Sequence, residues 1–107
     1  MDAELIAKVE YFNPASSVKD RAAYKIITDA IKDGRLKEGA PIIEATSGSM
    51  GIALAYISRL LGHRCIIVMP ESMSIERRRL IKAYGAELIL TPAAEGMSGA
   101  VEKAKSL

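Results

Sequence analysis

The sequence is poor in cysteine and in aromatic residues. It has one cysteine, Cys65, no tryptophan and one phenylalanine, and aromatic residues make up 5% of the 107 positions. A single cysteine cannot form a disulfide within the chain, which excludes the disulfide-rich secreted domains. We find neither a signal-peptide pattern nor an apolar run long enough to cross a bilayer. We therefore expect a protein of the reducing cytoplasm without a membrane partner.

The sequence also has few residues that could bind a metal, and it has no large excess of positive or negative charge. His63 is the only histidine, and no Cys, His or Asp stands around it at the spacing of a metal site, so we predict no metal. The 15 Lys and Arg residues nearly balance 13 Asp and Glu residues, which leaves a net charge of +2. Apart from three successive arginines at 77–79, which are expected to form a charged helix face, the positive charges are dispersed. The sequence thus predicts no nucleic-acid surface.

What the chain does have is a regular alternation of strand-like and helix-like segments. Apolar runs typical of strands are Glu4–Phe12, Pro41–Ala45, Cys65–Met69 and Glu87–Thr91. Helical spacing of apolar residues follows each run, over Val18 to about Asp33, Met50 to Leu61, Ser74 to Gly85 and Met97 to Leu107. Such alternation predicts a parallel sheet with helices on its faces. We expect residues 1–107 to form one three-layer α/β/α domain with about four strands.

One lysine is expected at the point where a loop enters a helix. Asn-Pro at 13–14 ends the first apolar run, and Ser17 followed three residues later by Asp20 is a capping-box pattern, so a helix should begin near Val18. Lys19 then lies in the first helical turn. The positive end of the helix dipole disfavours an ammonium group, so an amine there is a candidate nucleophile for carbonyl groups. An exposed lysine without a role is the alternative.

A glycine-bearing turn follows the second predicted strand. The stretch Thr46-Ser-Gly-Ser-Met-Gly51 places hydroxyl groups beside glycines at a helix start. Without Cβ atoms at Gly48 and Gly51, the backbone can form a cup of N–H donors that suits a carboxylate or a phosphate. A plain turn with Ser47 or Ser49 as the N-cap remains open. The turn matches neither a dinucleotide fingerprint nor a P-loop, and both loops are expected where ligands gather, at the carboxyl ends of parallel strands.

Motifs with a characteristic order and spacing run through the whole chain. They are Asn13-Pro14-x-x-Ser17-Val18-Lys19-Asp20-Arg21, then Thr46-Ser47-Gly48-x-x-Gly51, then Met69-Pro70-Glu71-x-Met73-Ser74-x-Glu76-Arg77-Arg78, then Gly85-Ala86-Glu87-Leu88. In these motifs the chain resembles the cysteine synthases (O-acetylserine sulfhydrylases), which are pyridoxal-phosphate enzymes of the tryptophan-synthase β-type fold. The resemblance covers nearly all of this sequence but a minority of a full family member. It implies that residues 1–107 are a truncated portion of a two-domain enzyme, chiefly the small N-terminal domain.

The resemblance also implies roles for particular residues. Lys19 matches the lysine that carries pyridoxal phosphate and moves the α-proton of the substrate. Thr46, Ser47 and Gly48 match the loop that binds the α-carboxylate of the amino-acid substrate. The implied reaction exchanges the acetate of O-acetylserine for sulfide and yields cysteine.

Two positions depart from the family pattern. Ser49 stands where the pattern has an asparagine that binds the cofactor's ring hydroxyl oxygen, and Met50 stands where a threonine adds a hydroxyl to the substrate-binding loop. Each change is expected to weaken binding, since one well-placed hydrogen bond contributes about 0.5–1.5 kcal/mol. A non-catalytic interaction module derived from this domain is therefore the alternative function.

The family also binds the cofactor through its larger domain. There a glycine- and threonine-rich loop holds the phosphate and a serine holds the ring nitrogen, and this sequence has no counterpart to either. We therefore expect weak or absent cofactor binding and no appreciable cysteine synthase activity from this chain alone. The nearly all-apolar helix at 50–57 is expected to expose one face, which favours a homodimer.

Overall fold

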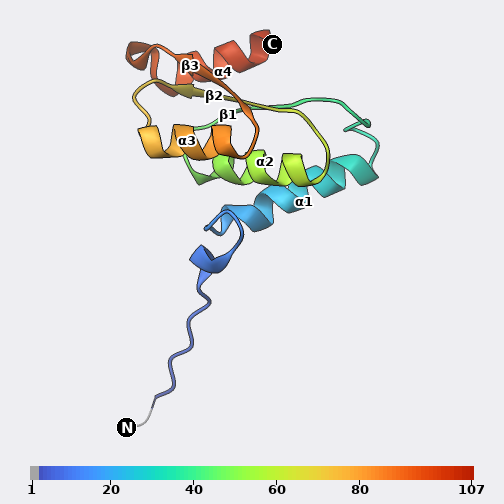
Figure 1. Cartoon of the computed structure of the whole chain (residues 1–107), viewed down its shortest axis with the longest axis vertical. Helices are drawn as coiled ribbons and strands as arrows, with labels where there is room; N and C mark the ends of the chain where they lie inside the picture. The colour runs from blue at the N-terminus through green and yellow to red at the C-terminus, as the bar shows by residue number, and fades with distance from the viewer. Residues whose placement is uncertain (1–2) are drawn as a thin grey trace.

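The computed structural model describes residues 3–107 and contains a parallel sheet between two layers of helices (Figure 1). Its strands are β1 (Ile42–Ala45), β2 (Cys65–Pro70) and β3 (Glu87–Thr91), in the order β1-β2-β3. Its α-helices are α1 (Lys19–Lys32), α2 (Ser49–Leu60), α3 (Ile75–Ala83) and α4 (Gly96–Ser106), and two short 3-10 helices are η1 (Glu10–Phe12) and η2 (Ala93–Glu95). Helix α4 covers one face of the sheet, α2 and α3 cover the other, and α1 packs beside α2. The predicted three-layer α/β/α fold is confirmed.

The central strand organises the core. Strand β2 pairs with β1 through Ile43↔Ile66 and with β3 through Val68↔Ile89, both in parallel register. Five of its six residues are buried, as its continuous apolar sequence predicts for a strand covered on both faces. Ile67 and Met69 of this strand pack with Ile27 of α1 and Ile81 of α3. The core thus lies between the sheet and the layer formed by α1, α2 and α3.

Local sequence signals set most element boundaries. Ser74 caps α3, because its hydroxyl accepts the backbone N–H of Arg77 at 3.3 Å. Gly34, with φ +79°, follows α1 and takes up the left-handed conformation that ends many helices. The predicted helix and strand boundaries after residue 17 agree with the structure within a few residues.

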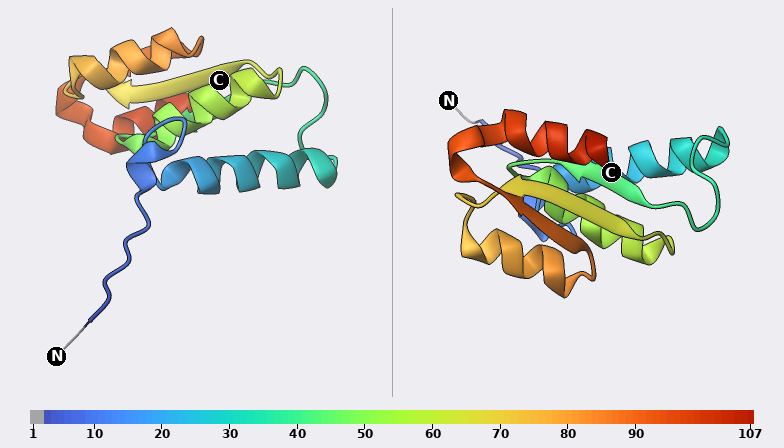
Figure 2. Two further views of the ribbon diagram at one scale, coloured as in Figure 1. Left: turned by 60° about the horizontal axis from the view of Figure 1, so that its bottom comes forward. Right: turned by 90° about the horizontal axis from the view of Figure 1, so that it is seen from above.

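The segment Glu4–Phe12 is not a strand, so the sheet has three strands where about four were expected. Residues 4–9 have no regular structure, and Glu10–Phe12 form η1. Leu5 is 95% exposed and Ile6 is 82% exposed, and Figure 2 shows this segment running away from the body of the domain. The apolar pattern is that of a strand, but strands need a hydrogen-bonded neighbour, and the described residues provide none here.

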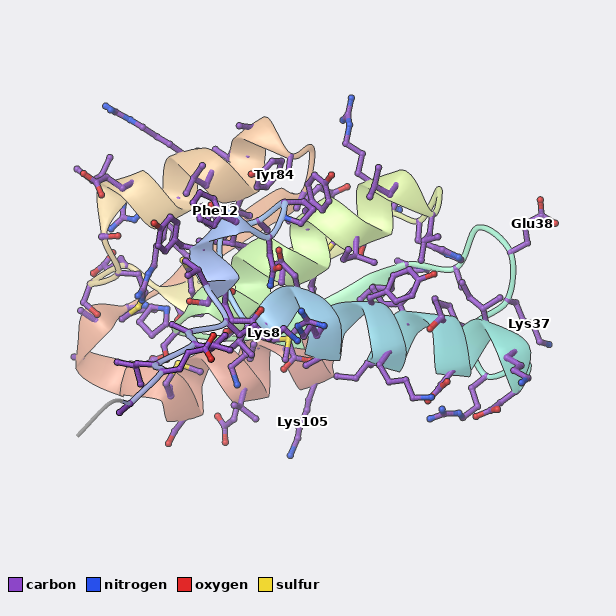
Figure 3. All side chains as sticks on the ribbon, turned by 90° about the horizontal axis from the view of Figure 1, so that it is seen from below. Lys8, Phe12, Lys37, Glu38, Tyr84 and Lys105 are labelled. Carbon is purple, nitrogen blue, oxygen red and sulfur yellow. The ribbon has the colours of Figure 1, made fainter. Side chains whose placement is uncertain are left out.

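The rest of the surface carries both charged and large apolar side chains, with Tyr24, Leu60 and Ile75 each more than half exposed. Figure 3 shows Lys37, Glu38 and Lys105 pointing outward from the body of the domain. The ring of Tyr84 meets that of Tyr56 edge-on, with centroids 5.2 Å apart, and so joins α2 to the end of α3. Among residues 3–107, no helix has the length and apolar character needed to cross a membrane.

Candidate functional site

Lys19 is the first residue of α1 and is exposed. The loop before it is fixed by Asp20, which is 6% exposed and whose Oδ2 accepts the N–H of Ala15 at 2.7 Å. The hydroxyl of Ser17 accepts the N–H of Lys19 at 3.1 Å. The predicted capping box is therefore wrong in detail, because the Asp20 carboxylate binds the loop at Ala15 instead of returning to Ser17. The helix nevertheless begins close to the predicted position, and Lys19 lies in its first turn.

A second group of contacts ties this loop to η1. The side-chain amide of Asn13 donates to Glu10 Oε2 at 2.5 Å and to the carbonyl of Ser17 at 2.9 Å. Arg21 Nε also donates to Glu10 Oε2, at 3.1 Å. The Asn13 hydrogen bond, together with Arg21, lowers the pKa of Glu10 below its ordinary value. Asn13 thus bridges η1 and the residues just before Lys19.

The second predicted site follows the end of β1. Thr46 is buried, and its backbone N–H donates to the carbonyl of Val68 at 3.0 Å, which continues the pairing of β1 with β2. Its hydroxyl oxygen accepts the N–H of Gly48 at 3.3 Å. Ser47 is exposed, and Gly48 and Ser49 are half-buried. These residues form a tight turn between the sheet and α2.

No side chain caps the start of α2. Gly48 occupies the N-cap position, and neither Ser47 nor Ser49 provides a capping hydrogen bond, so the alternative of a plain serine N-cap is wrong. The space where a Cβ of Gly48 would lie is open to 4 Å. Backbone N–H groups at an uncapped helix start favour an anion through their donors and the helix dipole. The start of α2 thus keeps backbone N–H donors without a side-chain cap, and the anion cup stays a prediction.

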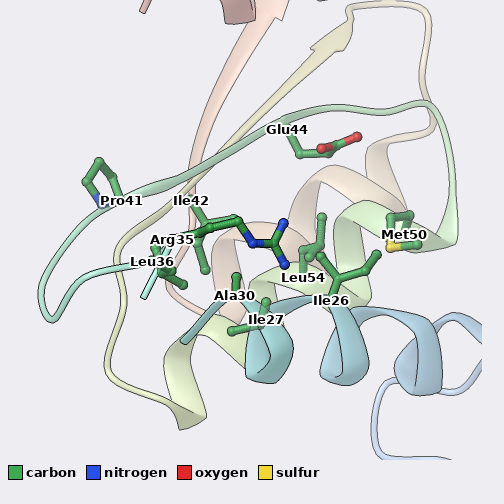
Figure 4. Close-up of a pocket in the computed structure, with 10 residues that line it drawn as sticks. All are labelled: Ile26, Ile27, Ala30, Arg35, Leu36, Pro41, Ile42, Glu44, Met50 and Leu54. Carbon is green, nitrogen blue, oxygen red and sulfur yellow. The ribbon is translucent and has the colours of Figure 1, made fainter. Parts of the chain in front are cut away.

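The side chain of Met50 lies elsewhere. It packs against the hydrophobic core and, with Ile26 and Ile27 of α1 and Leu54 of α2, lines an apolar pocket of about 300 Å³ (Figure 4). Arg35 and Glu44 also border this pocket. Met50 thus joins α1 to the first turn of α2, and its side chain serves packing there.

The two predicted loops occur at one end of the domain. Figures 1 and 2 show the blue start of α1 and the green start of α2 toward the same end, where the strands also finish. Met50 lines the same pocket as Ile26 and Ile27, which places the first turn of α2 near the middle of α1. Within residues 3–107, Lys19 takes part in no ion pair. The exposed amine and the uncapped helix start thus belong to neighbouring helices that begin at the same end.

The sequence did not indicate that Arg77 contacts the turn at 46–48. Its Nη1 donates to the carbonyl oxygen of Ser47 at 2.7 Å, across 30 residues of sequence. In the sequence it is one of three successive arginines, which were predicted to form a charged helix face. The one available signal was its position three residues after the helix cap Ser74.

Comparison with known proteins agrees with the motifs. The family described as pyridoxal-phosphate dependent enzyme matches residues 1–107. A cysteine synthase of Staphylococcus aureus (strain N315) is 51% identical over 105 residues, which are 98% of this chain and 34% of that protein. The chain therefore spans about a third of the length of the curated relatives that it matches.

Solved structures give the same result. The crystal structure of a cysteine synthase from Entamoeba histolytica has a TM-score of 0.89 and 56% identity, over 92% of this chain and 29% of that one. The O-acetylserine dependent cystathionine β-synthase from Helicobacter pylori has a TM-score of 0.87 and 42% identity, over 94% of this chain and 33% of that one. The chain belongs to the family of pyridoxal-phosphate dependent enzymes.

Proposed function

We propose that this chain provides the cofactor-bearing lysine and the carboxylate-binding loop of a cysteine synthase, which replaces the acetate of O-acetylserine with sulfide. One observation carries the proposal: Lys19 begins α1 and the uncapped turn at 46–48 begins the neighbouring helix α2, at the same end of the domain. The 51% identity to a cysteine synthase over nearly the whole chain supports this choice within the family.

The residues present fit the roles that a pyridoxal-phosphate enzyme requires. The turn offers an open space at Gly48 and uncapped N–H groups, which suit the α-carboxylate of an amino acid. The Nζ atom of Lys19 would hold the cofactor at its aldehyde carbon, and would take and return the α-proton of the substrate. The hydroxyl of Ser49, the first residue of α2, would face the ring hydroxyl oxygen. When bound, pyridoxal phosphate supplies an electron sink for charge that develops at the α-carbon.

We further propose that this chain alone has no appreciable cysteine synthase activity. The resemblance assigns the phosphate-binding loop and the serine at the ring nitrogen to the larger domain, and the chain matches 34% of its curated relatives. A cofactor held through Lys19 and Ser49 without those contacts is exposed to water and easily lost. Activity then depends on the residues that the relatives carry outside the matched third.

A second candidate is a non-catalytic module that associates with another polypeptide or with itself. Ser49 lacks the amide of the family's asparagine, and the side chain of Met50 serves packing against α1. Large apolar side chains, among them Phe12, Tyr24 and Ile26, are more than half exposed. The helix at 50–57 does not provide this surface, so the exposed face expected there is wrong: its residues are buried or half-buried against the core. Exposed apolar surface elsewhere still favours association, here as a homodimer.

Reductive labelling separates the two candidates. The chain is incubated with pyridoxal phosphate, reduced with borohydride and digested, and the modified lysines are identified by mass spectrometry. Lys25 is the matched control, because it lies on the same helix and is exposed but pairs with Asp29 at 3.1 Å. Selective modification of Lys19 over Lys25 supports the enzymatic role. Equal modification of the two, or stronger modification of Lys25, contradicts it and favours the interaction module.

A further inference from the structure

Arg77 occupies a position where a helix does not favour a cation. It is the third residue of α3, and the N-cap Ser74 accepts its backbone N–H. The start of a helix stabilises negative charge, and a capping box would place Glu or Gln at this position. Residues that break a local preference are expected at functional positions. The reason for an arginine here therefore has to lie outside its own helix.

The guanidinium of Arg77 contacts the loop that precedes helix α2. Its Nη1 donates to the carbonyl oxygen of Ser47 at 2.7 Å, a short charge-assisted hydrogen bond. Ser47 stands between Thr46 and Gly48 in the loop for which we propose carboxylate binding. Arg77 thus joins α3 to the middle of that loop.

The same peptide unit is held at its other side. The carbonyl bound by Arg77 and the N–H of Gly48 belong to one planar peptide, and this N–H donates to Thr46 Oγ1 at 3.3 Å. Because the peptide is planar, fixing its oxygen also fixes the direction of its N–H. Arg77 and Thr46 together set the orientation of the Ser47–Gly48 peptide.

The conformation of Gly48 itself adds little restraint on this peptide. Gly48 has φ −143° and ψ −153°, and no heavy atom lies within 4 Å of where its Cβ would be. Neither a left-handed conformation nor crowding thus accounts for a glycine here. Glycine also rotates more freely than other residues, which lowers the cost of turning this peptide. The orientation of the Ser47–Gly48 peptide therefore depends on its two hydrogen bonds, to Arg77 and to Thr46.

The start of α3 is a firm base for such a contact. Arg78 Nε donates to the carbonyl of Met73 at 3.2 Å, and its guanidinium also binds the carbonyl of Glu71. The N–H of Glu71 donates to the carbonyl of Thr91 at the end of β3, at 2.8 Å. Arg77 thus extends from a segment that is anchored to the sheet.

We propose that Arg77 is a positioning residue for the carboxylate-binding loop: it holds the Ser47–Gly48 peptide so that the first-turn N–H groups of α2 face one ligand. The functional part of this inference rests on the proposed function, whereas the structural part does not. Arg77 acts through the loop and donates no hydrogen bond to the ligand itself.

Amide hydrogen exchange of the ¹⁵N-labelled chain tests the structural part. R77A and R77Q should speed exchange of the Gly48 N–H about tenfold, as expected for loss of a charge-assisted hydrogen bond, while R77K restores part of the protection through one remaining donor. R79A removes an exposed arginine from the same helix and should leave Gly48 unchanged. Unchanged exchange in R77A would overturn the assignment. So would an equal loss of protection throughout β1 and α2 in both R77K and R77Q, which would indicate a general loss of stability.

Titration with O-acetyl-L-serine, followed by the NMR shifts of the Gly48 and Ser49 amides, tests the functional part. We expect R77A to weaken binding about tenfold and R77K to recover part of it. Equal binding by R77A and the unsubstituted chain would overturn the positioning role. If neither amide of the unsubstituted chain responds, carboxylate binding by this loop fails, and the exchange experiment still decides whether Arg77 holds the peptide.

Discussion

A Cβ atom on Gly51 would lie 2.5 Å from Cγ2 of Thr46. Gly51 is buried in the first turns of α2, and Thr46 is buried at the end of β1. The glycine thus allows α2 to approach the loop that it follows. We expect G51A to lower the free energy of unfolding by about 1–3 kcal/mol, as overpacking of a core does. Urea denaturation measures this loss.

Gly48 is the matched control, since its Cβ position is open. Because Gly48 is the N-cap of α2, where alanine is less favourable than glycine, G48A should lower the free energy of unfolding by up to about 1 kcal/mol, less than G51A does. Equal losses of stability in the two variants would show that the close approach of α2 to Thr46 is not what position 51 requires.

Ser16 is the one described residue other than glycine with a positive φ, 68°. Its N–H donates to the carbonyl of Asn13 at 2.7 Å, so the turn holds it in that conformation. A left-handed conformation costs a residue with a Cβ roughly 1–2 kcal/mol. Glycine avoids this cost, but it loses more conformational entropy on folding, which offsets part of the gain. We expect S16G to raise the urea midpoint and S16A, which keeps the Cβ, to leave it unchanged. A less stable S16G would contradict the strain.

Glu10 gives the chain an acid-sensitive contact. The pKa of its carboxyl is lowered from the ordinary 4.5 by the Asn13 hydrogen bond and by Arg21. Because the folded-state pKa is lowered, this contribution to stability is complete above the ordinary value and is lost as pH falls through the lowered one. E10Q should therefore lose less stability on acidification than the unsubstituted chain, as urea midpoints at neutral and acid pH would show. Equal losses of stability on acidification in E10Q and in the unsubstituted chain would show that the contacts of Glu10 do not cause the pH dependence.

Ser49 is the position where an amide should strengthen cofactor binding. S49N restores the side chain that the family pattern has at the start of α2, and one added hydrogen bond is expected to be worth about 0.5–1.5 kcal/mol. We expect a several-fold rise in pyridoxal-phosphate affinity, measured by absorbance titration. S47N places an amide on the exposed neighbour as a control. An equal gain from both variants, or none from S49N, would argue against the proposed contact.

Most of the fold could be predicted because local and tertiary signals agree. The apolar sequence of β2 meets helices on both faces of the sheet, and the hydroxyl of Ser74 caps the helix that it precedes. Glu4–Phe12 has a similar apolar pattern but no partner strand among residues 3–107. An apolar pattern indicates which side chains favour burial. It does not indicate whether another strand or helix is present to cover them.

The candidate site, too, could be predicted only in part. The turn at 46–48 could be predicted because glycines and hydroxyls at a helix start have a local meaning. The contact of Arg77 with Ser47 could not, because it joins residues 30 positions apart and depends on how α3 lies beside α2. Met50 was assigned to the substrate-binding loop from its place in the motif, whereas its side chain lies between α1 and α2. The motif predicts the position of Met50 along the chain, but not the direction of its side chain.

Lys19 is expected to lie beside the turn at 46–48, and a spin label at position 19 tests this most directly. The label is attached to K19C, since the native Cys65 is buried and burial raises the pKa of its thiol. Helix α2 is roughly 18 Å long at 1.5 Å per residue, so its two ends are readily distinguished. We predict strong broadening of the Thr46 to Ser49 amide signals and weak broadening at Gly62, beyond the far end of α2. Stronger broadening at Gly62 than at Gly48 would contradict the account.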